Sequence, residues 1–580
     1  MEAIYVESVP RIQIRKLLLK LADSRVLVLF VMPLALYIAL SHFMPLIEPD
    51  ESRYFEISDN MVDSGDYVMP RLHGVIYLEK PPLSYWASAL IFRLFGETDF
   101  TTRLYVGLCA WACLLLVYFM GSFLRDGTTG LYASGMLGTS LFFFIFGNFN
   151  ILDVPLTLYT CLAIWAGYRH LTGAADKRAW LYLLYLSSAL AFLTKGLIGV
   201  VFPFAILGIW LVLGGQWKRC AALFSPVGIV LFVAVTSPWI VLVQREHEDF
   251  LRFFFVQEHF LRYTTTMHGR DNSILLYLPV VIIGCLPWTA FLVRAAWEVR
   301  KNRNSVPALQ GKGFLWTWIV FIFVFFSLSS SKLIPYIAPI FIPMSVLIGS
   351  MLKNYEFLSP FPRKGAGSSL LQLPVRLQSI LFIALLLLPM FFHNGSRLGG
   401  DLSIVHSRQW LWLIILPVCT QVMLSFVPDR VGKRRRRGWF VTIYVLSGLF
   451  LISILPSASA FLTPYKSSYP ASQAINMLVP ADRELYQYKI LLYGIATYNE
   501  IRTPVVDDFG ELGYGMKFLP PEERNHYFLS VDQFKARVGE EGIVYCLTEY
   551  RDRFDELKRM YPKLELLWSN GAYYLAKLKS

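Results

Sequence analysis

The sequence predicts a polytopic α-helical membrane protein of about thirteen transmembrane helices, followed by a small soluble α/β domain. Of its 580 residues, 55% are hydrophobic and only 16% are charged, and the mean hydropathy is +0.48. A soluble multidomain protein could not bury so much apolar surface. Apolar runs of membrane-spanning length follow one another through most of the chain, whereas residues 463–580 have the patterns of a soluble fold.

The apolar runs predict membrane helices in order along the chain. They lie at residues 26–46, 104–124, 130–147, 154–168, 180–193, 197–213, 220–243, 274–293, 314–328, 333–352, 377–392, 410–426 and 439–455. The first run is about twenty residues long, which exceeds the apolar core of a signal peptide, and it follows several basic residues. We therefore expect an uncleaved first helix that begins in the cytoplasm.

Basic residues identify the cytoplasmic loops. They recur at Arg125, Lys177 with Arg178, Lys218 with Arg219, 294–312, 353–364 and 433–437, which are alternate connections between the predicted helices. This alternation satisfies the positive-inside rule and accounts for most of the formal net charge of +13 without nucleic acid. With an odd number of helices, the C-terminal region lies outside the cytoplasm. The seven cysteines are scattered, and they predict no disulfide framework or zinc site.

Three segments are expected outside the membrane on the outer side. The loop 48–103 contains a short apolar run at 83–95, which predicts a helix lying in the interface, and a second loop covers 244–273. The boundary near 462 divides a membrane domain, 1–462, from a soluble domain, 463–580. In that domain, strand-like runs at 542–547 and 572–575 alternate with helical patterns at 532–538 and 552–560.

Four cations lie on the outer side, where the charge rule does not require them. They are Lys80, Lys195, Arg270 and Lys332. Long basic side chains at membrane ends can simply extend to the interface, which is the alternative for each one. Four of them at the ends of different helices indicate an anionic ligand, and phosphate suits both lysine and arginine.

Carboxylates accompany these cations on the same side. Asp50 and Glu51 precede Arg53, and they could act as a general base, orient a nucleophile or share a metal. Asp153 begins an apolar helix, so it could equally be an N-cap. Glu79 and His268 are candidate metal ligands, although a single histidine in a loop is a weak signal.

An ordered series of short motifs adds a family resemblance. The series comprises Asp50-Glu51-Ser52-Arg53-Tyr54, Ser64-Gly65-Asp66, Glu79-Lys80-Pro81-Pro82, Leu152-Asp153, Leu193-Thr194-Lys195-Gly196, Glu258-His259 with Arg262, His268-Gly269-Arg270, Leu286-Pro287-Trp288 and Ser331-Lys332-Leu333 with Tyr336. Each motif alone is weak, but their order covers most of the membrane part. The chain resembles the GT-C membrane glycosyltransferases, specifically the lipid A aminoarabinose transferases and the bacterial protein-mannosyltransferase-like group.

The resemblance implies a polyprenyl-phosphate sugar donor and an active site that faces the periplasm. It assigns Lys80, Arg270, Lys195, Lys332 and Tyr336 to the lipid phosphate, Asp50, Asp153, Glu51 and Arg53 to catalysis, and Glu79 with His268 to a divalent metal ion, zinc or magnesium. The segment after Arg270 and the Val154-Pro155 pair depart from the family pattern. These departures leave the sugar and the acceptor open.

The function predicted is an inverting transfer of 4-amino-4-deoxy-L-arabinose from undecaprenyl phosphate to a lipid A phosphate. The expected enzyme is a monomer in the bacterial inner membrane. Alternatives are a related transferase with another sugar or acceptor, an anionic-lipid flippase, and a structural envelope subunit; a transporter would typically contain internal repeats, which the sequence lacks. We expect no essential catalytic group in the tail, a solvated surface at Asp507, Asp508 and Glu511, and a buried Cys546.

Overall fold

The computed structural model describes most of the membrane part and nearly all of the tail. The described residues are 24–39, 44–173, 176–261, 273–289, 291, 311–357, 444–445, 447–449, 451–452, 459 and 462–579. The predicted spans 377–392 and 410–426, and much of 439–455, lie outside these residues.

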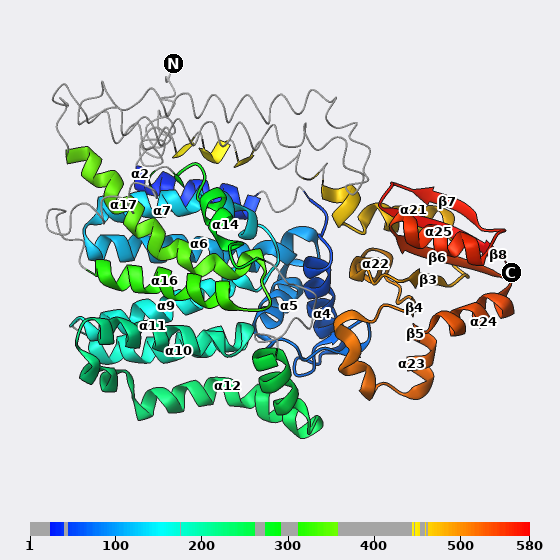
Figure 1. Ribbon diagram of the computed structural model, residues 1–580, viewed down its shortest axis with the longest axis horizontal. Helices are drawn as coiled ribbons and strands as arrows, with labels where there is room; N and C mark the ends of the chain where they lie inside the picture. Colours follow the sequence, from blue (N-terminus) through cyan, green and yellow to red (C-terminus); the bar gives the residue numbers. More distant parts are fainter. Residues whose placement is uncertain are drawn as a thin grey trace, which may run out of the picture.

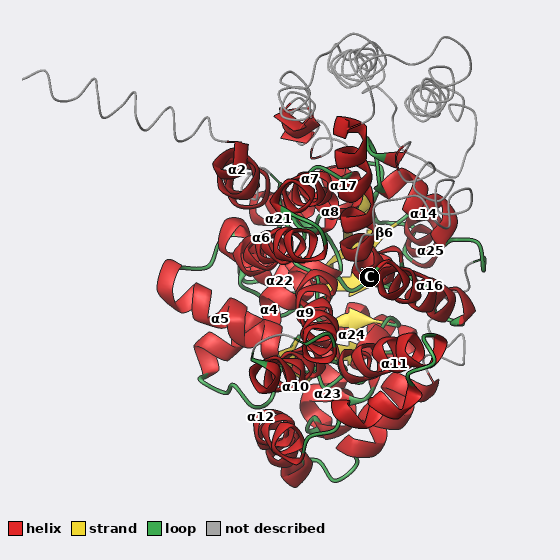
Figure 2. Cartoon of the chain, turned by 90° about the vertical axis from the view of Figure 1, so that its left-hand side faces the viewer, coloured by secondary structure: helices red, strands yellow, loops and turns green. Residues whose placement is uncertain are grey.

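The membrane part is a bundle of helices (Figure 1). In chain order the elements are α2 (Ser24–Val26), η1 (Leu27–Val31), α3 (Met32–Leu34), η2 (Ala35–Ala39), α4 (Asp50–Ser64), β1 (Arg71–Leu72), β2 (Val75–Ile76), α5 (Leu83–Phe95), α6 (Asp99–Leu124), α7 (Gly127–Gly138), α8 (Leu141–Phe146), α9 (Asp153–Leu171), α10 (Lys177–Lys195), α11 (Ile198–Leu213), η3 (Trp217–Leu223), α12 (Pro226–Glu246), η4 (Arg252–Leu261), α14 (Tyr277–Gly284), α16 (Lys312–Leu328), η5 (Ile334–Ile340) and α17 (Phe341–Phe357). Figure 2 shows α6, α9 and α10 close to end-on.

Three of the described helices are long and apolar enough to cross a membrane, at Asp99–Leu124, Pro226–Glu246 and Ile334–Lys353. The predicted span 130–147 is instead two helices, α7 and α8. The hydroxyls of Thr139 and Ser140 donate to the carbonyls of Gly135 and Leu137, at 2.8 and 2.9 Å. Such local bonds compete with the helical ladder, and here they accompany the break between the two helices.

Two other predicted spans also begin differently. The span predicted from residue 220 begins at Pro226, because proline suits the first helical turn and the Ser225 hydroxyl accepts from the Gly228 N–H at 3.1 Å. The span predicted from residue 333 opens with the 3-10 segment η5, which contains Pro335 and Pro339, before α17. The helix predicted at 83–95 is present as α5.

The segment 48–103, predicted as an outer loop, contains two helices and a small hairpin before α6 begins at Asp99. β1 and β2 pair antiparallel through a tight turn at His73 and Gly74. α4 begins directly after Pro49, and Gly65 ends it in the left-handed conformation at φ 69°, which glycine adopts without a steric penalty. α4 is buried along most of its length, so its residues contact protein on several sides.

The tail is a six-stranded mixed sheet with helices. Its elements are α21 (Tyr469–Leu478), β3 (Leu485–Tyr488), α22 (Tyr493–Asn499), β4 (Val505–Val506), η7 (Gly510–Gly513), η8 (Gly515–Phe518), α23 (Pro521–Tyr527), β5 (Phe528–Leu529), α24 (Val531–Glu541), β6 (Ile543–Glu549), α25 (Arg551–Met560), β7 (Glu565–Ser569) and β8 (Tyr573–Lys579). The strand order is β5-β4-β3-β6-β8-β7. The first four run parallel, and β8 lies antiparallel to both of its neighbours. Cys546 is fully buried in β6, as predicted.

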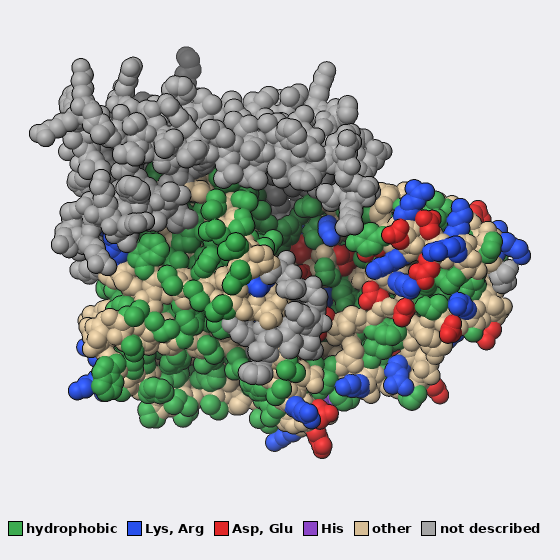
Figure 3. Space-filling model, in the orientation of Figure 1, with side chains coloured by type: hydrophobic (Ala, Val, Ile, Leu, Met, Phe, Trp, Pro, Cys, Tyr) green, Lys and Arg blue, Asp and Glu red, His purple; other side chains and the backbone are tan. Residues whose placement is uncertain are grey.

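The tail packs directly on α4 and the hairpin. A single hydrophobic cluster joins Tyr54 and Ile57 of α4 to Tyr493, Leu512 and Phe528 of the tail. In Figure 3 the membrane part presents mainly apolar side chains, whereas the tail surface carries many charges of both signs. The tail therefore combines a solvated outer surface with a buried face toward α4.

Candidate active site

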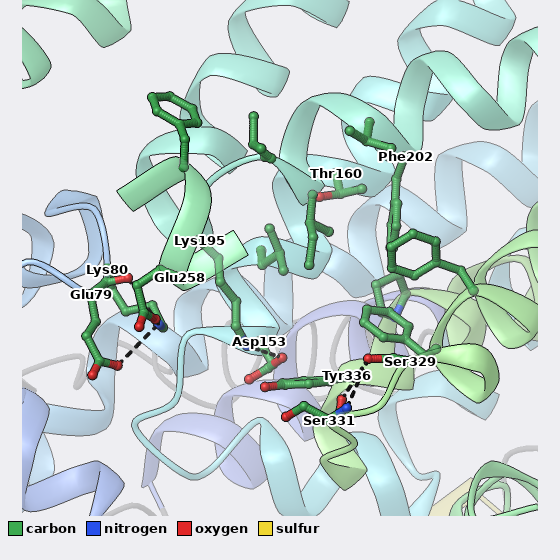
Figure 4. A pocket seen from close by; sticks show the side chains of 18 residues that line it. Glu79, Lys80, Asp153, Thr160, Lys195, Phe202, Glu258, Ser329, Ser331 and Tyr336 are labelled. Atoms are coloured by element: carbon green, nitrogen blue, oxygen red, sulfur yellow. Dashed lines mark hydrogen bonds and ion pairs between the residues drawn. The ribbon is translucent and has the colours of Figure 1, made fainter. Parts of the chain in front are cut away.

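A cavity of about 380 Å³ lies between the ends of several helices and the segments that carry Glu79, Lys80 and Glu258. Its apolar wall comes from α9, α11 and α16 and includes Leu156, Phe202 and Phe326. Its polar residues are Glu79, Lys80, Asp153, Thr160, Lys195, Glu258, Ser329, Ser331 and Tyr336. Figure 4 shows the charged residues gathered in two clusters, one around Lys80 and one around Lys195. An apolar wall beside a charged end suits an amphipathic ligand.

Lys80 is the centre of the first cluster. It follows the hairpin and precedes Pro81 and Pro82, which lead into α5. Its ammonium lies 3.2 Å from the Glu258 carboxylate and 3.6 Å from that of Glu79, and all three side chains are buried. A buried ammonium between two carboxylates is held in place and charged, and an incoming anion could take over either contact.

Lys195 and Asp153 form the second cluster. The Lys195 ammonium donates to Asp153 Oδ1 at 2.6 Å and lies 4.6 Å from the centre of the Tyr336 ring. Asp153 occupies the first position of α9, and the preceding residue, Leu152, is the N-cap and has no side-chain capping bond. The N-cap alternative for Asp153 is therefore wrong, and its carboxylate points to Lys195 in the cavity (Figure 4).

Lys332 lies beside the cavity at the end of α16. Its ammonium donates to the Ser329 carbonyl at 2.6 Å, and only 6% of the residue is exposed. Ser329 lines the cavity, whereas Lys332 is not among the lining residues. Three of the four predicted outer cations therefore lie in or next to one cavity. The fourth, Arg270, lies outside the described residues, as does His268.

A series of polar side-chain contacts connects Asp50 to the Lys80 cluster. Arg53 forms ion pairs with Asp50, one turn earlier on α4, and with Glu511 of the tail. The Tyr77 hydroxyl donates to Glu511 at 3.1 Å and lies 3.4 Å from Glu79. Glu511 is thus not the solvated residue that the sequence suggests, because only 14% of its side chain is exposed. The sequence gives no signal for this contact, since Glu511 stands among loop-forming glycines.

Glu51 has different surroundings from its neighbour Asp50. Its carboxylate pairs with the Arg103 guanidinium of α6 at 2.7 Å and accepts the Asn150 N–H at 2.8 Å. It also accepts the Ile47 N–H at 3.0 Å. Glu51 is 1% exposed and is not among the cavity-lining residues. These contacts fix α4 against α6 and against the loop that leads to Asp153.

Among the described residues, the cavity carboxylates do not form a metal-binding cluster. The described part of the chain contains one group of three suitable side chains, Asp59, Asp63 and Glu97, whose ligand atoms lie within 4.8 Å of one another. These carboxylates are partly or fully exposed and do not line the cavity. A metal at Glu79 and His268 stays a prediction.

Similar proteins agree with this architecture. The family profile for dolichyl-phosphate-mannose-protein mannosyltransferases matches residues 79–242. An undecaprenyl phosphate-α-4-amino-4-deoxy-L-arabinose arabinosyl transferase from Edwardsiella ictaluri is 26% identical over 93% of this chain and 97% of its own. The enzyme of that name from Yersinia enterocolitica is 32% identical over 55% of this chain and 58% of its own.

The solved structures extend the agreement to nearly the whole chain. The structure of ArnT from Cupriavidus metallidurans bound to undecaprenyl phosphate superposes with a TM-score of 0.79 at 22% identity, over 96% of this chain and 98% of that one. The chain has the GT-C fold of this membrane glycosyltransferase. This GT-C assignment confirms the resemblance that the ordered motifs indicated.

The GT-C fold explains why the site includes residues from so many elements. The family profile begins at Glu79 and covers Lys80, Asp153 and Lys195. It ends before Glu258, and the tail residue Glu511 lies far beyond it. Glu258 belongs to one of the sequence motifs, but its pairing with Lys80 emerges only from the folded chain.

Proposed function

We propose that the chain is an inverting glycosyltransferase that moves 4-amino-4-deoxy-L-arabinose from undecaprenyl phosphate to a phosphate of lipid A. The observation that carries this proposal is the cavity with an apolar wall, a buried Lys80 and a partly buried Lys195. A polyprenyl chain would lie along the apolar wall, and its phosphate would meet Lys80 and Lys195. The names of the full-length relatives support this donor and this sugar.

The chemistry follows from the leaving group. An acceptor oxygen attacks the anomeric carbon, the new C–O bond forms on the opposite face, and the bond to polyprenyl phosphate breaks. The leaving phosphate gains negative charge, which Lys80 and Lys195 would stabilise because both line the cavity next to its apolar wall. Positioning the two reactants supplies most of the remaining rate acceleration.

The acceptor determines whether a base is needed. A lipid A phosphate oxygen is already anionic and attacks without one. A sugar hydroxyl would require proton removal, and Asp50 is our candidate base because half of its side chain is exposed, at 48%, while Arg53 orients it. Asp153 keeps Lys195 in position, and Lys332 and Tyr336 support the same end of the cavity.

Three further features belong to the proposal. Arg270 would bind the lipid phosphate together with Lys80, and Arg270→Ala should then lower transfer as strongly as Lys80→Ala. Glu79 and His268 would hold a divalent ion, zinc or magnesium, which metal analysis of the purified protein tests. The enzyme would act as a monomer in the bacterial inner membrane, with the cavity and the tail on the periplasmic side.

The direct test uses purified full-length protein, labelled undecaprenyl-phosphate aminoarabinose and lipid A. We expect label to move to lipid A with inversion at the anomeric carbon, and boiled protein serves as the control. Transfer only to another acceptor, or only from another sugar donor, would change the proposed substrates. The reaction would still be a glycosyl transfer. Movement of intact donor lipid across the membrane without any transfer would instead favour the flippase.

A further inference from the structure

Glu56 is a buried carboxyl on the helix that carries Asp50 and Arg53, yet it is not a cavity-lining residue. It is 7% exposed, and its Oε1 accepts the His73 N–H at 2.5 Å. Its other oxygen, Oε2, is buried and has no hydrogen-bond partner. At such a place an ionised carboxylate with one hydrogen bond costs much more free energy than a neutral carboxyl.

The hairpin turn beside Glu56 is held by the tail. His73 is 2% exposed, and its Nε2 lies 2.8 Å from the Thr503 carbonyl. Because a carbonyl only accepts, Nε2 must carry the proton, which leaves the buried Nδ1 without a partner. Gly74, at φ 72°, lies against the Arg502 guanidinium, so that a Cβ at this position would collide with it. The turn is therefore enclosed between α4 and the tail segment 502–503.

The charged groups around Glu56 come from each element packed against it. Glu48 lies just before α4, Asp59 lies in the middle of α4, His73 comes from the hairpin and Arg502 comes from the tail. Arg502 forms an ion pair with Glu523 and stacks on the Tyr527 ring at 3.8 Å. The tail cation next to Glu56 is thus already engaged within the tail.

We propose that Glu56 is a positioning residue whose neutral form docks the tail on α4, and that this docking keeps Glu511 on Arg53 at the edge of the active site. Two tail contacts lie close to Glu56 in the chain. The Gly494 N–H donates to Glu48, just before α4, at 2.7 Å, and Glu511 pairs with Arg53 of α4. The contact between Arg53 and Glu511 would then depend on a proton at Glu56, slightly less than one helical turn from Arg53.

The pKa values of Glu56 and His73 agree with this arrangement of buried groups between α4 and the tail. Burial raises the pKa of Glu56 from 4.5 to about 8, so docking weakens as the pH rises between these values. Burial also lowers the pKa of His73 from 6.5 to about 4, so docking weakens as the pH falls between those values. The two effects oppose each other between 4.5 and 6.5. Above 6.5 the Glu56 effect continues to about 8, in the same direction as that of Asp59, whose pKa burial raises from 3.8 to about 7.

The test is hydrogen exchange on the full-length protein between pH 6.5 and pH 8. Amide exchange rates are first corrected for the pH dependence of intrinsic exchange. We then expect protection in α22 and the β1–β2 hairpin of the wild type to fall by roughly tenfold, because each pH unit below the raised pKa changes the docking equilibrium by a factor of up to ten. In Glu56→Gln, this change should be clearly smaller, because the titration of Glu56 is removed while those of Asp59 and Glu48 remain. Asp63→Asn, on the exposed side of the same helix, is the matched control and should behave like the wild type.

The transfer assay gives a second reading, and only this reading rests on the proposed function. The ratio of Glu56→Gln activity to wild-type activity should rise at least about threefold over the same pH range. If the wild type shows no transfer, the proposed function fails, whereas hydrogen exchange still tests the docking. If Glu56→Gln does not fold, the wild type alone tests the proposal, and protection of α22 and the hairpin that stays constant between pH 6.5 and pH 8 would overturn it. Equal pH dependence in wild type and Glu56→Gln would overturn the proposal as well.

Discussion

Carboxyl groups lie both in the cavity and in the seam, the contact of Glu48, Glu56 and His73 with the tail. The two regions provide different hydrogen-bond partners for these carboxyl groups. In the cavity, Asp153 contacts the ammonium of Lys195, and Glu258 that of Lys80. In the seam, Glu48 and Glu56 accept backbone N–H groups from Gly494 and His73, and burial raises the pKa of both carboxyls. A charged pair can exchange a partner for a charged ligand, whereas a neutral acid bonded to backbone favours a closed contact.

Arg53 joins the two regions. It contacts Asp50 on the outer side of the cavity and Glu511 in the tail. A change in the cavity should therefore affect ligand binding and turnover directly, and a change in the seam should act through Arg53. The size of the effect should decrease from the cavity to the outer surface of the tail.

The largest effect is expected at Lys80. Lys80→Ala should lower kcat/KM for transfer by at least about tenfold, because losing a charge-assisted contact to phosphate costs roughly 1.5 to 3 kcal/mol. Lys535→Ala, an exposed lysine of the tail, is the control and should leave transfer unchanged. Near-normal activity of Lys80→Ala at equal expression would show that the cavity cation does not bind the donor.

Asp153→Asn should come next, with turnover lowered by about tenfold at an unchanged melting temperature. The amide keeps the shape of the side chain but removes the charge that holds Lys195 at 2.6 Å. Thermal unfolding of the same sample separates loss of function from loss of folding. Full activity in this variant would mean that the pair with Lys195 has no part in the reaction.

Glu511→Gln tests the connection between the two regions and should lower transfer by about fivefold. The substitution leaves a buried Arg53 with Asp50 as its remaining carboxylate among the described contacts, so part of its orientation is lost. The effect should appear in kcat more than in KM, because Arg53 lies outside the cavity lining. Wild-type kinetics would indicate that Asp50 alone orients Arg53.

The smallest effect is expected at Asp507. This residue is exposed on the tail, so Asp507→Ala should keep transfer within a factor of about five, or roughly 1 kcal/mol. Comparing the transfer activities of Asp507→Ala and Glu511→Gln shows whether only the buried face of the tail affects the reaction. A large loss of activity in a well-folded Asp507→Ala protein would extend the functional surface of the tail beyond Glu511.

The sequence alone indicated Lys80 and Lys195, because both violate the charge rule for membrane proteins and stand in motifs of a known family. It also indicated the membrane helices, since hydrophobicity along a helix is a local property. It did not indicate where an apolar run is interrupted. The division into α7 and α8 occurs at Thr139 and Ser140, whose hydroxyls bond to carbonyls within the preceding turn.

Tertiary structure decided which charges meet. Glu511 lies 458 residues from Arg53 and 434 from Tyr77, and its flanking sequence is that of a solvated loop. Docking of the tail on α4 brings it to the site, and no local pattern records that docking. Asp50 and Glu51 are neighbours in the sequence, but successive helical residues point in different directions, so one contacts Arg53 and the other contacts Arg103. Composition and spacing identify residues that can carry charge, whereas packing between distant segments assigns each charge its partner.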